Sequence, residues 1–223
     1  MKNRLVFGLF ACVGLGLFAE EPRKTVLLLG DSIRLGYCAD VKELLKDIAD
    51  VRYPEENGRF AYYTLRMICE WTNLVEDPKA VDVVHFNNGL WDLGQRDGRE
   101  CLTPVGIYEV TMSRIADEIR HYFPNAKLIF ATTTPVNEAV FDSWHAKGNA
   151  EVVKYNEAAL KALTGKIAAV DDLYSFVRDH EIKRCYKDIV HYTPEGSKFL
   201  AQKVSVSILS VLKDCGRNRV NEN

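Results

Sequence analysis

Val26-Leu27-Leu28-Leu29-Gly30-Asp31-Ser32, near the N-terminus of this chain of 223 residues, is the stretch that decides its fold. A short run of apolar residues is typical of a buried strand, and Gly-Asp-Ser then forms a tight turn before a segment that is predicted to be helical. Such a turn exposes the Ser32 hydroxyl, and the N-terminus of the helix directs backbone N–H groups and the positive end of its dipole at whatever the hydroxyl attacks. The same tripeptide is also common as a simple helix cap, so by itself it does not establish chemistry.

The remainder of the chain alternates between predicted strands and helices. Strands are predicted at residues 25–30, 51–53, 81–86, 127–132 and 167–170, and helices at 41–49, 60–71, 104–123, 150–163 and 194–212. Apolar strands between amphipathic helices predict an α/β fold, a three-layer α/β/α sandwich whose central parallel sheet is covered on both faces. Ligands bind beyond the carboxyl ends of the strands in such sheets. Polar residues follow four of the predicted strands at that edge, namely Ser32, Asn57-Gly58, Asn87-Asn88-Gly89 and Thr132-Thr133-Thr134.

The composition excludes several classes of protein. Hydrophobic residues make up 47% of the chain, which is normal for a packed globule, and the formal net charge is −2. The sequence has no basic stripe, so no nucleic-acid partner is expected. It also lacks the C-x-x-C, H-x-E and H-E-x-x-H spacings of zinc sites, so we expect neither a metal nor another cofactor.

Residues 1–19 have the order of regions that is typical of a secretory signal peptide. A short basic start, residues 1–4, is followed by an apolar stretch, and Ala19 precedes Glu20-Glu21-Pro22. We therefore expect cleavage near Ala19 and export to the periplasm or the extracellular space. No stable membrane span is expected after cleavage, because the apolar run is too short for one. Lipidation at Cys12 and an uncleaved anchor are the alternatives.

Export would leave one domain, residues 24–213, followed by a polar C-terminal tail, residues 214–223. It would also leave an odd number of cysteines, Cys38, Cys69, Cys101, Cys185 and Cys215, because Cys12 lies in the predicted signal. At least one thiol then has no partner within the chain. Buried free thiols and one or two disulfides are both compatible with the sequence, which predicts no particular pairing.

An acid and a base lie far downstream of Ser32, in the tetrapeptide Asp188-Ile189-Val190-His191. An imidazole can take the proton of a serine hydroxyl, and a carboxylate can hold the imidazole through its other nitrogen. Ser32, Asp188 and His191 are therefore a candidate catalytic triad. The remaining histidines and three further aspartates are predicted to lie in the core, on the surface, in turns or at helix ends: His85, His121, His145, His180, Asp92, Asp171 and Asp172.

Together, these blocks resemble the SGNH (GDSL-type) hydrolase superfamily. Gly30-Asp31-Ser32 matches its nucleophile block, Asn57-Gly58 resembles its second block, and residues 188–191 match its last block, D-x-x-H. The resemblance covers residues 24–212 and implies the flavodoxin-like sandwich of this superfamily. It also implies that Ser32, Asp188 and His191 are catalytic and that backbone N–H groups of Ser32 and Gly58 form part of an oxyanion hole.

The third block departs from the superfamily pattern. That pattern is G-x-N-D, whose asparagine side chain lies in the oxyanion hole, whereas this chain has Gly89-Leu90-Trp91-Asp92. The preceding Phe86-Asn87-Asn88-Gly89 instead resembles the F-N-x-G segment of a branch of esterases and acetyltransferases that act on polysaccharides. We expect Asn87 to be the third donor, with Asn88 or the Trp91 indole as alternatives, since each carries an N–H group. Turn formation by the asparagines and a position of Trp91 in the cleft wall are the structural alternatives.

The resemblance implies an exported serine esterase that hydrolyses carboxylic esters through an acyl-enzyme and needs no cofactor. Its implied partner is a small-molecule or polysaccharide ester, and the third block favours removal of O-acetyl groups from carbohydrates. The alternatives are a lipase or thioesterase acting on longer acyl chains and an acetyltransferase acting on envelope glycans. A glycan-binding relic of the fold is the alternative without enzymatic activity, and the intact triad counts against it.

Overall fold

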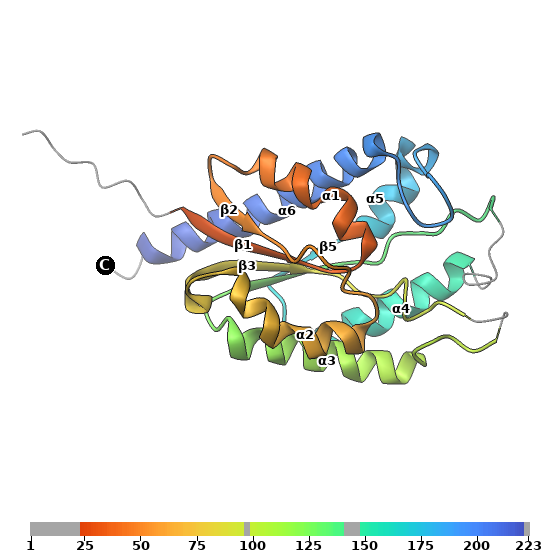
Figure 1. The fold of residues 1–223 in the computed structure, drawn as a ribbon, viewed down its shortest axis with the longest axis horizontal. Helices are drawn as coiled ribbons and strands as arrows, with labels where there is room; N and C mark the ends of the chain where they lie inside the picture. Colours follow the sequence, from red (N-terminus) through yellow and green to blue (C-terminus); the bar gives the residue numbers. More distant parts are fainter. Residues whose placement is uncertain (1–22, 96–98, 141–147, 221–223) are drawn as a thin grey trace, which may run out of the picture.

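The computed structural model describes residues 23–95, 99–140 and 148–220. Within these ranges, five parallel strands form one sheet in the order β2-β1-β3-β4-β5 (Figure 1). The strands are β1 (Lys24–Leu29), β2 (Ala49–Arg52), β3 (Val81–Phe86), β4 (Lys127–Ala131) and β5 (Ala169–Asp171). The predicted signal peptide and the alternative lipidation site Cys12 lie outside the described residues.

Helices cover both faces of this sheet, as the alternating sequence pattern predicts. On one face, α1 (Ser32–Leu44) packs beside α6 (Pro194–Val220); on the other lie α2 (Ala61–Trp71), α3 (Val105–Tyr122) and α4 (Gly148–Ala162) (Figure 1). The connections contain α5 (Leu173–Asp179) and the short 3₁₀ helices η1 (Thr72–Leu74), η2 (Pro78–Ala80) and η4 (Glu181–Arg184). The expected three-layer α/β/α sandwich is confirmed.

The inner strands of the sheet form the centre of the core. Val26 to Leu29 of β1 are each 0% exposed, and so are Val83, Val84 and Phe86 of β3. A parallel sheet that is covered by helices buries both of its faces, so its strands are continuous apolar runs rather than alternating ones. This burial on both faces explains why the apolar run before Gly30 predicted a strand.

Two helices differ in extent from the prediction. The helix predicted at 41–49 begins at Ser32 and ends at Leu44, because the chain turns there and β2 begins at Ala49. Leu45 and Ala49 are both buried and are spaced as on one face of a helix, but Leu45 lies in the turn after α1 and Ala49 in β2. The final helix continues to Val220 instead of ending at residue 212, so part of the predicted polar tail is helical.

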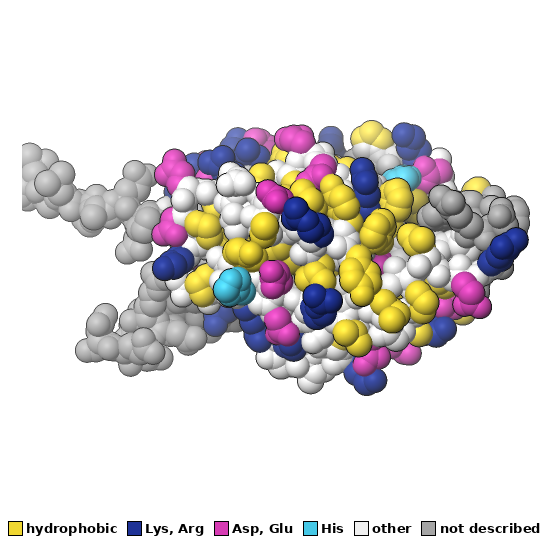
Figure 2. All heavy atoms as spheres, turned by 60° about the horizontal axis from the view of Figure 1, so that its bottom comes forward, with side chains coloured by type: hydrophobic (Ala, Val, Ile, Leu, Met, Phe, Trp, Pro, Cys, Tyr) yellow, Lys and Arg dark blue, Asp and Glu magenta, His cyan; other side chains and the backbone are white. Residues whose placement is uncertain are grey.

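The outer side of α2 and α3 mixes apolar and charged side chains (Figure 2). Tyr62 of α2 and Ile107 and Val110 of α3 are exposed, whereas Ile68 and Met112 on the same helices are fully buried. Exposed apolar residues that are interspersed with charged ones are normal on a soluble surface. These helices therefore bury one side against the sheet and leave the other to solvent.

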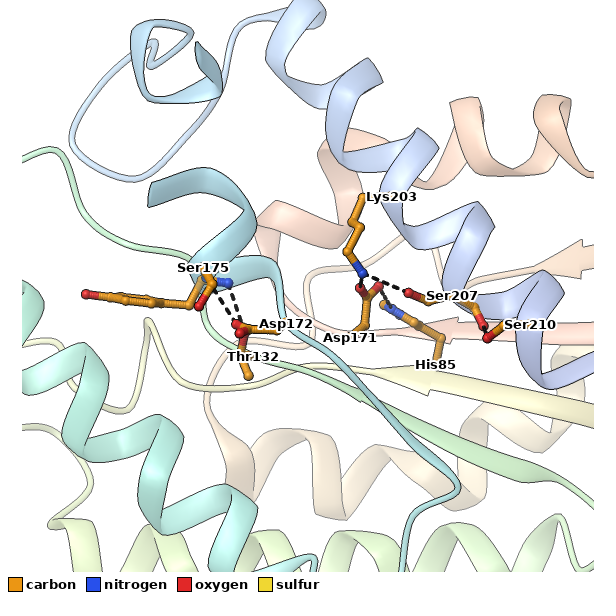
Figure 3. Close-up of polar contacts among 9 residues, drawn as sticks. His85, Thr132, Asp171, Asp172, Ser175, Lys203, Ser207 and Ser210 are labelled. Atoms are coloured by element: carbon orange, nitrogen blue, oxygen red, sulfur yellow. Dashed lines mark hydrogen bonds and ion pairs between the residues drawn. The ribbon is translucent and has the colours of Figure 1, made fainter. Parts of the chain in front are cut away.

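A hydrogen-bonded cluster around the buried Asp171 joins the sheet to α6 (Figure 3). The Asp171 carboxylate, at the end of β5, lies 3.0 Å from Nε2 of His85 on β3 and 2.5 Å from Nζ of Lys203 on α6. Both Asp171 and His85 are 0% exposed. Burial would raise the pKa of Asp171, but the hydrogen bonds and charges of His85 and Lys203 outweigh it and hold that pKa below its usual value. Asp171 is therefore an ion-pair partner and not the turn former or cap that its position predicts.

Two other aspartates cap helices, as predicted. Both Asp92 carboxyl oxygens accept from the backbone N–H of Ala61, at 3.1 and 3.0 Å, at the start of α2. Asp172 accepts from the backbone N–H of Ser175 in the first turn of α5, at 3.0 Å. Burial raises the pKa of Asp92 to about 7, against the opposing hydrogen bonds from the Ala61 N–H and the Thr103 side chain.

Replacing Asp171 with asparagine should lower the free energy of unfolding by roughly 3 kcal/mol, because it leaves the Lys203 ammonium without its carboxylate. This loss is at the lower end of the range for breaking a buried ion pair, because the Lys203 side chain is 28% exposed. Urea denaturation at neutral pH measures the effect. Asp117→Asn is the control: it breaks the more exposed pair of Asp117 with Lys166 and should cost less than about 1 kcal/mol. Equal costs for the two substitutions would contradict this role of Asp171.

Asp92 should make the stability of the protein depend on pH. Its pKa is about 7 in the folded protein, above the 3.8 of the free side chain. The stability that protonated Asp92 contributes is therefore complete below about pH 4 and is lost as the pH rises through about 7. The loss in the free energy of unfolding is up to roughly 4 kcal/mol. Asp92→Asn keeps an acceptor for the Ala61 N–H but cannot ionise. The melting temperature of wild type relative to this variant should fall between pH 5 and pH 8, and a constant difference would refute the assignment.

Candidate active site

The nucleophile turn connects β1 to α1. Asp31 is the N-cap of α1, since its Oδ1 accepts from the Ile33 backbone N–H at 2.9 Å, and Ser32 is the first residue of the helix. Gly30 has a φ of +151°, and a Cβ there would lie 1.9 Å from Oδ1 of Asn87. Glycine is thus required both by the backbone conformation and by the neighbouring side chain. The turn leaves Ser32 half-buried at the carboxyl edge of the sheet.

The structure brings Ser32, His191 and Asp188 together, although Ser32 and His191 are 159 positions apart in the chain. His191 Nε2 lies 2.9 Å from Ser32 Oγ. On the other side of the ring, His191 Nδ1 lies 2.9 Å from Oδ2 and 3.1 Å from Oδ1 of Asp188. A serine, an imidazole and a carboxylate are thus connected in series, in the arrangement that lets a histidine accept a serine proton.

The loop around Asp188 keeps its carboxyl ionised and its position fixed. Burial would raise the pKa of Asp188. Hydrogen bonds from the backbone N–H groups of His191 and Val190 and from the His191 side chain outweigh burial, so the pKa lies below its usual value. The Tyr186 and Tyr192 rings stack across the loop with centroids 4.8 Å apart. An ionised carboxylate at this place can orient the imidazole and stabilise its protonated form.

Gly58 lies beside the nucleophile turn, but its N–H does not point into an open site. The Gly58 N–H donates to the Gly30 carbonyl at 2.9 Å, and a Cβ at Gly58 would lie 2.6 Å from that oxygen. The next N–H, that of Arg59, donates to Asn57 Oδ1 at 2.7 Å. In this structure the N–H that was predicted to serve the oxyanion is therefore engaged within the protein. Here glycine is needed because the two backbones approach closely.

The three predicted side-chain donors lie in different surroundings. Asn87 is 5% exposed and lies against Gly30. Burial raises the pKa of Asp31, and a hydrogen bond with the Asn87 side chain opposes that rise, so Asn87 also contacts the second residue of the turn. The Asn88 side chain is directed toward residues 59–64, because its Nδ2 donates to the Arg59 carbonyl and to Thr64 Oγ1. Trp91 is half-buried.

Arg34 is a buried residue that stabilises the backbone around the site, a role that the sequence pattern does not indicate. It is 0% exposed, and its guanidinium donates to the carbonyl oxygens of Pro54 at 2.7 Å, Glu56 at 2.5 Å and Gly30 at 3.2 Å. These bonds tie the segment before Gly58 to the nucleophile turn. An arginine in the first turns of an amphipathic helix normally indicates a solvent-facing position, so only its spacing from Ser32 could have drawn attention to it.

Residues 23–95, 99–140 and 148–220 give no sign of a metal centre or of a membrane span. No group of three or more His, Cys, Asp or Glu side chains there is arranged to hold a metal ion. No helix in those same ranges is long and apolar enough to cross a membrane. Cys38, Cys69, Cys101 and Cys185 do not form disulfides.

Comparison with known proteins gives one sequence relative and several structures of the same fold. No family model matches the chain. A GDSL esterase/lipase of Oryza sativa subsp. japonica, WDL1, is 26% identical over 216 residues, which is 88% of this chain and 81% of that protein. The crystal structure of the acetyl xylan esterase AlAXEase has a TM-score of 0.65 and 19% identity, covering 82% of this chain and 99% of that one. The crystal structure of a lipase/acylhydrolase from Enterococcus faecalis has a TM-score of 0.64 and 18% identity, covering 83% of this chain and 95% of that one.

The structural likeness extends over nearly all of each solved chain, so the whole described domain has this fold and not only a part of it. The sequence likeness to a GDSL esterase/lipase agrees with the Gly-Asp-Ser and D-x-x-H blocks. The resemblance that the sequence blocks indicated is confirmed: the chain is similar in sequence to a GDSL esterase/lipase and has the fold of these solved esterase and acylhydrolase structures.

Proposed function

We propose that the chain is an exported serine esterase that hydrolyses carboxylic esters through an acyl-enzyme. Ser32 is the nucleophile, His191 the general base and Asp188 the residue that orients His191. The observation that carries this proposal is the 2.9 Å contact between His191 Nε2 and Ser32 Oγ, with Nδ1 of the same ring on Asp188. The relative and the solved structures support an ester as the substrate.

In the first half of the reaction, Ser32 Oγ attacks the ester carbonyl carbon while His191 Nε2 takes its proton. The Asp188 carboxylate stabilises the resulting imidazolium. When the tetrahedral intermediate collapses, the C–O bond to the alcohol breaks and His191 gives the proton to the leaving oxygen. Water, activated by His191 in the same way, then attacks the acyl-serine, and release of the carboxylic acid restores Ser32.

The oxyanion of each tetrahedral intermediate requires hydrogen-bond donors near Ser32. The Ser32 backbone N–H lies at the N-terminus of α1, where the helix dipole also favours negative charge. We assign the side-chain donor to Asn87, which lies against the nucleophile turn. An amide has two N–H bonds to donate, and those of Asn88 go to the Arg59 carbonyl and to Thr64 Oγ1. The Asn87 side chain, in contrast, has one hydrogen bond within the described residues, with Asp31. Loss of one such donor typically raises the barrier by about 3 kcal/mol.

The substrate class proposed is an O-acetyl ester of a carbohydrate. Three observations favour it: the likeness to an acetyl xylan esterase, the Phe86-Asn87-Asn88-Gly89 segment, and the signal-like N-terminus, which would deliver the enzyme to extracellular glycans. An esterase of longer acyl chains is the second candidate, because a lipase/acylhydrolase has the same fold at a similar TM-score.

Removal of either reacting group should abolish the chemistry and leave the fold intact. Ser32→Ala should eliminate both covalent labelling by a fluorophosphonate probe and hydrolysis of p-nitrophenyl acetate. His191→Ala should lower kcat by roughly 10⁴-fold or more, as the loss of other triad bases does. Labelling gels and steady-state kinetics measure these effects, with circular dichroism as the check on folding.

Ser175→Ala and His180→Ala are the matched controls, since both residues lie on or just after α5, outside the candidate site. Both controls should keep wild-type labelling and kcat. Undiminished labelling of Ser32→Ala would remove Ser32 from the mechanism.

The length of the acyl chain distinguishes the two candidate substrates. A pocket built for acetyl gains nothing from added methylenes and soon excludes them, so kcat/KM should fall steeply from acetyl to butyryl to octanoyl p-nitrophenyl esters. Acetate should also be released from acetylated xylan or pectin. A roomy lipase groove would instead gain up to about 0.8 kcal/mol, or roughly fourfold in kcat/KM, for each buried methylene. Rising efficiency towards octanoyl with no acetate released from any glycan would favour the second candidate.

A further inference from the structure

Arg59 has an unusual backbone conformation beside the nucleophile turn. Its φ is +49°, and among residues 23–95, 99–140 and 148–220 it is the non-glycine residue with a positive φ. This left-handed region is unfavourable for a residue with a Cβ, and residues held in it cluster at functional sites. The preceding residue, Gly58, is bonded to the carbonyl of Gly30, two residues before Ser32. The strained residue therefore adjoins the turn that carries the candidate nucleophile.

The Asn88 side chain holds this segment from the end of β3. Its Nδ2 donates to the Arg59 carbonyl at 3.2 Å and to Thr64 Oγ1 at 2.9 Å. The Thr64 hydroxyl in turn donates to the Gly58 carbonyl at 3.0 Å. One amide group thus fixes two successive carbonyls, that of Arg59 directly and that of Gly58 through Thr64.

Asn88 is itself rigidly placed. It is 0% exposed, and its backbone carbonyl accepts hydrogen bonds from the Tyr108 hydroxyl of α3 at 2.8 Å and from Thr133 Oγ1 at 2.9 Å. Arg59, in contrast, is an exposed residue whose guanidinium lies over the Tyr63 ring, 4.8 Å from its centroid. A buried side chain whose Nδ2 donates two hydrogen bonds can therefore impose a backbone conformation on an exposed segment.

We propose that Asn88 is a positioning residue that holds Arg59 in the left-handed conformation and thereby fixes the backbone of residues 58–60 beside Ser32. The inference rests on the proposed function, because the reaction that it supports is the one assigned to Ser32. Asn88 acts through the backbone of Arg59, so the guanidinium is not required. A glycine at position 59 adopts the same φ without help, because it has no Cβ.

This last point provides the test, which is steady-state hydrolysis of p-nitrophenyl acetate by the full chain. Asn88→Ala should lower kcat by roughly 10- to 100-fold with KM within about threefold of wild type, because the segment beside the reacting groups is displaced while the substrate still binds. Adding Arg59→Gly to Asn88→Ala should raise kcat at least fivefold. Adding Arg59→Ala should not, although it removes the same guanidinium.

Two results would overturn the proposal: wild-type kcat in Asn88→Ala, or equal kcat in the two double variants. A merely structural role of Asn88 predicts that equality, because neither substitution at 59 replaces its hydrogen bonds. Should Asn88→Ala fail to fold, Asn88→Asp takes its place, because aspartate has nearly the same size as asparagine but lacks the amide donors. It is then combined with Arg59→Gly and with Arg59→Ala in the same way. Failure of the proposed function is distinct, because wild type would then neither hydrolyse the ester nor react with the fluorophosphonate.

Discussion

The close approach of three segments to Gly30 is the constraint on which the rest of the site depends. The Gly58 N–H and the Arg34 guanidinium both donate to its carbonyl, and the Asn87 side chain fills the space that a Cβ would occupy. β1 can therefore end in contact with its neighbours and leave Ser32 as the first residue of α1. The place of the hydroxyl is set by packing around a residue that takes no part in the chemistry.

The sequence predicted the layers of the fold and the members of the candidate triad, because each leaves a local signal. A run buried on both faces is apolar throughout, and D-x-x-H places Asp188 and His191 on one loop. The cluster around Asp171 leaves no such signal. His85 is 86 positions from Asp171 and Lys203 is 32 positions from it, so only the folded chain brings the three side chains together.

The direction of a single N–H is harder still to obtain from sequence. The Asn57-Gly58 block drew attention to this segment, but the Gly58 N–H donates to the carbonyl of Gly30, a residue distant in the sequence that only the fold brings near. One sign of the turn was available. Asn57 accepts from the N–H two residues later, as asparagine side chains commonly do in turns. That pattern predicts a turn, but not which donors remain for a ligand.

The contact between Ser32 and His191 depends on how two helices pack. Ser32 begins α1, His191 lies just before α6, and these helices lie against each other on one face of the sheet. Lys203, roughly three turns into α6, is tied to Asp171 in the sheet, so the ion pair fixes the helix without touching the reacting groups. The ion pair thus lies well inside α6, whereas the candidate base His191 adjoins its N-terminal end. If Ser32 and His191 react as proposed, weakening the ion pair should lower the rate only to the extent that α6 moves relative to α1.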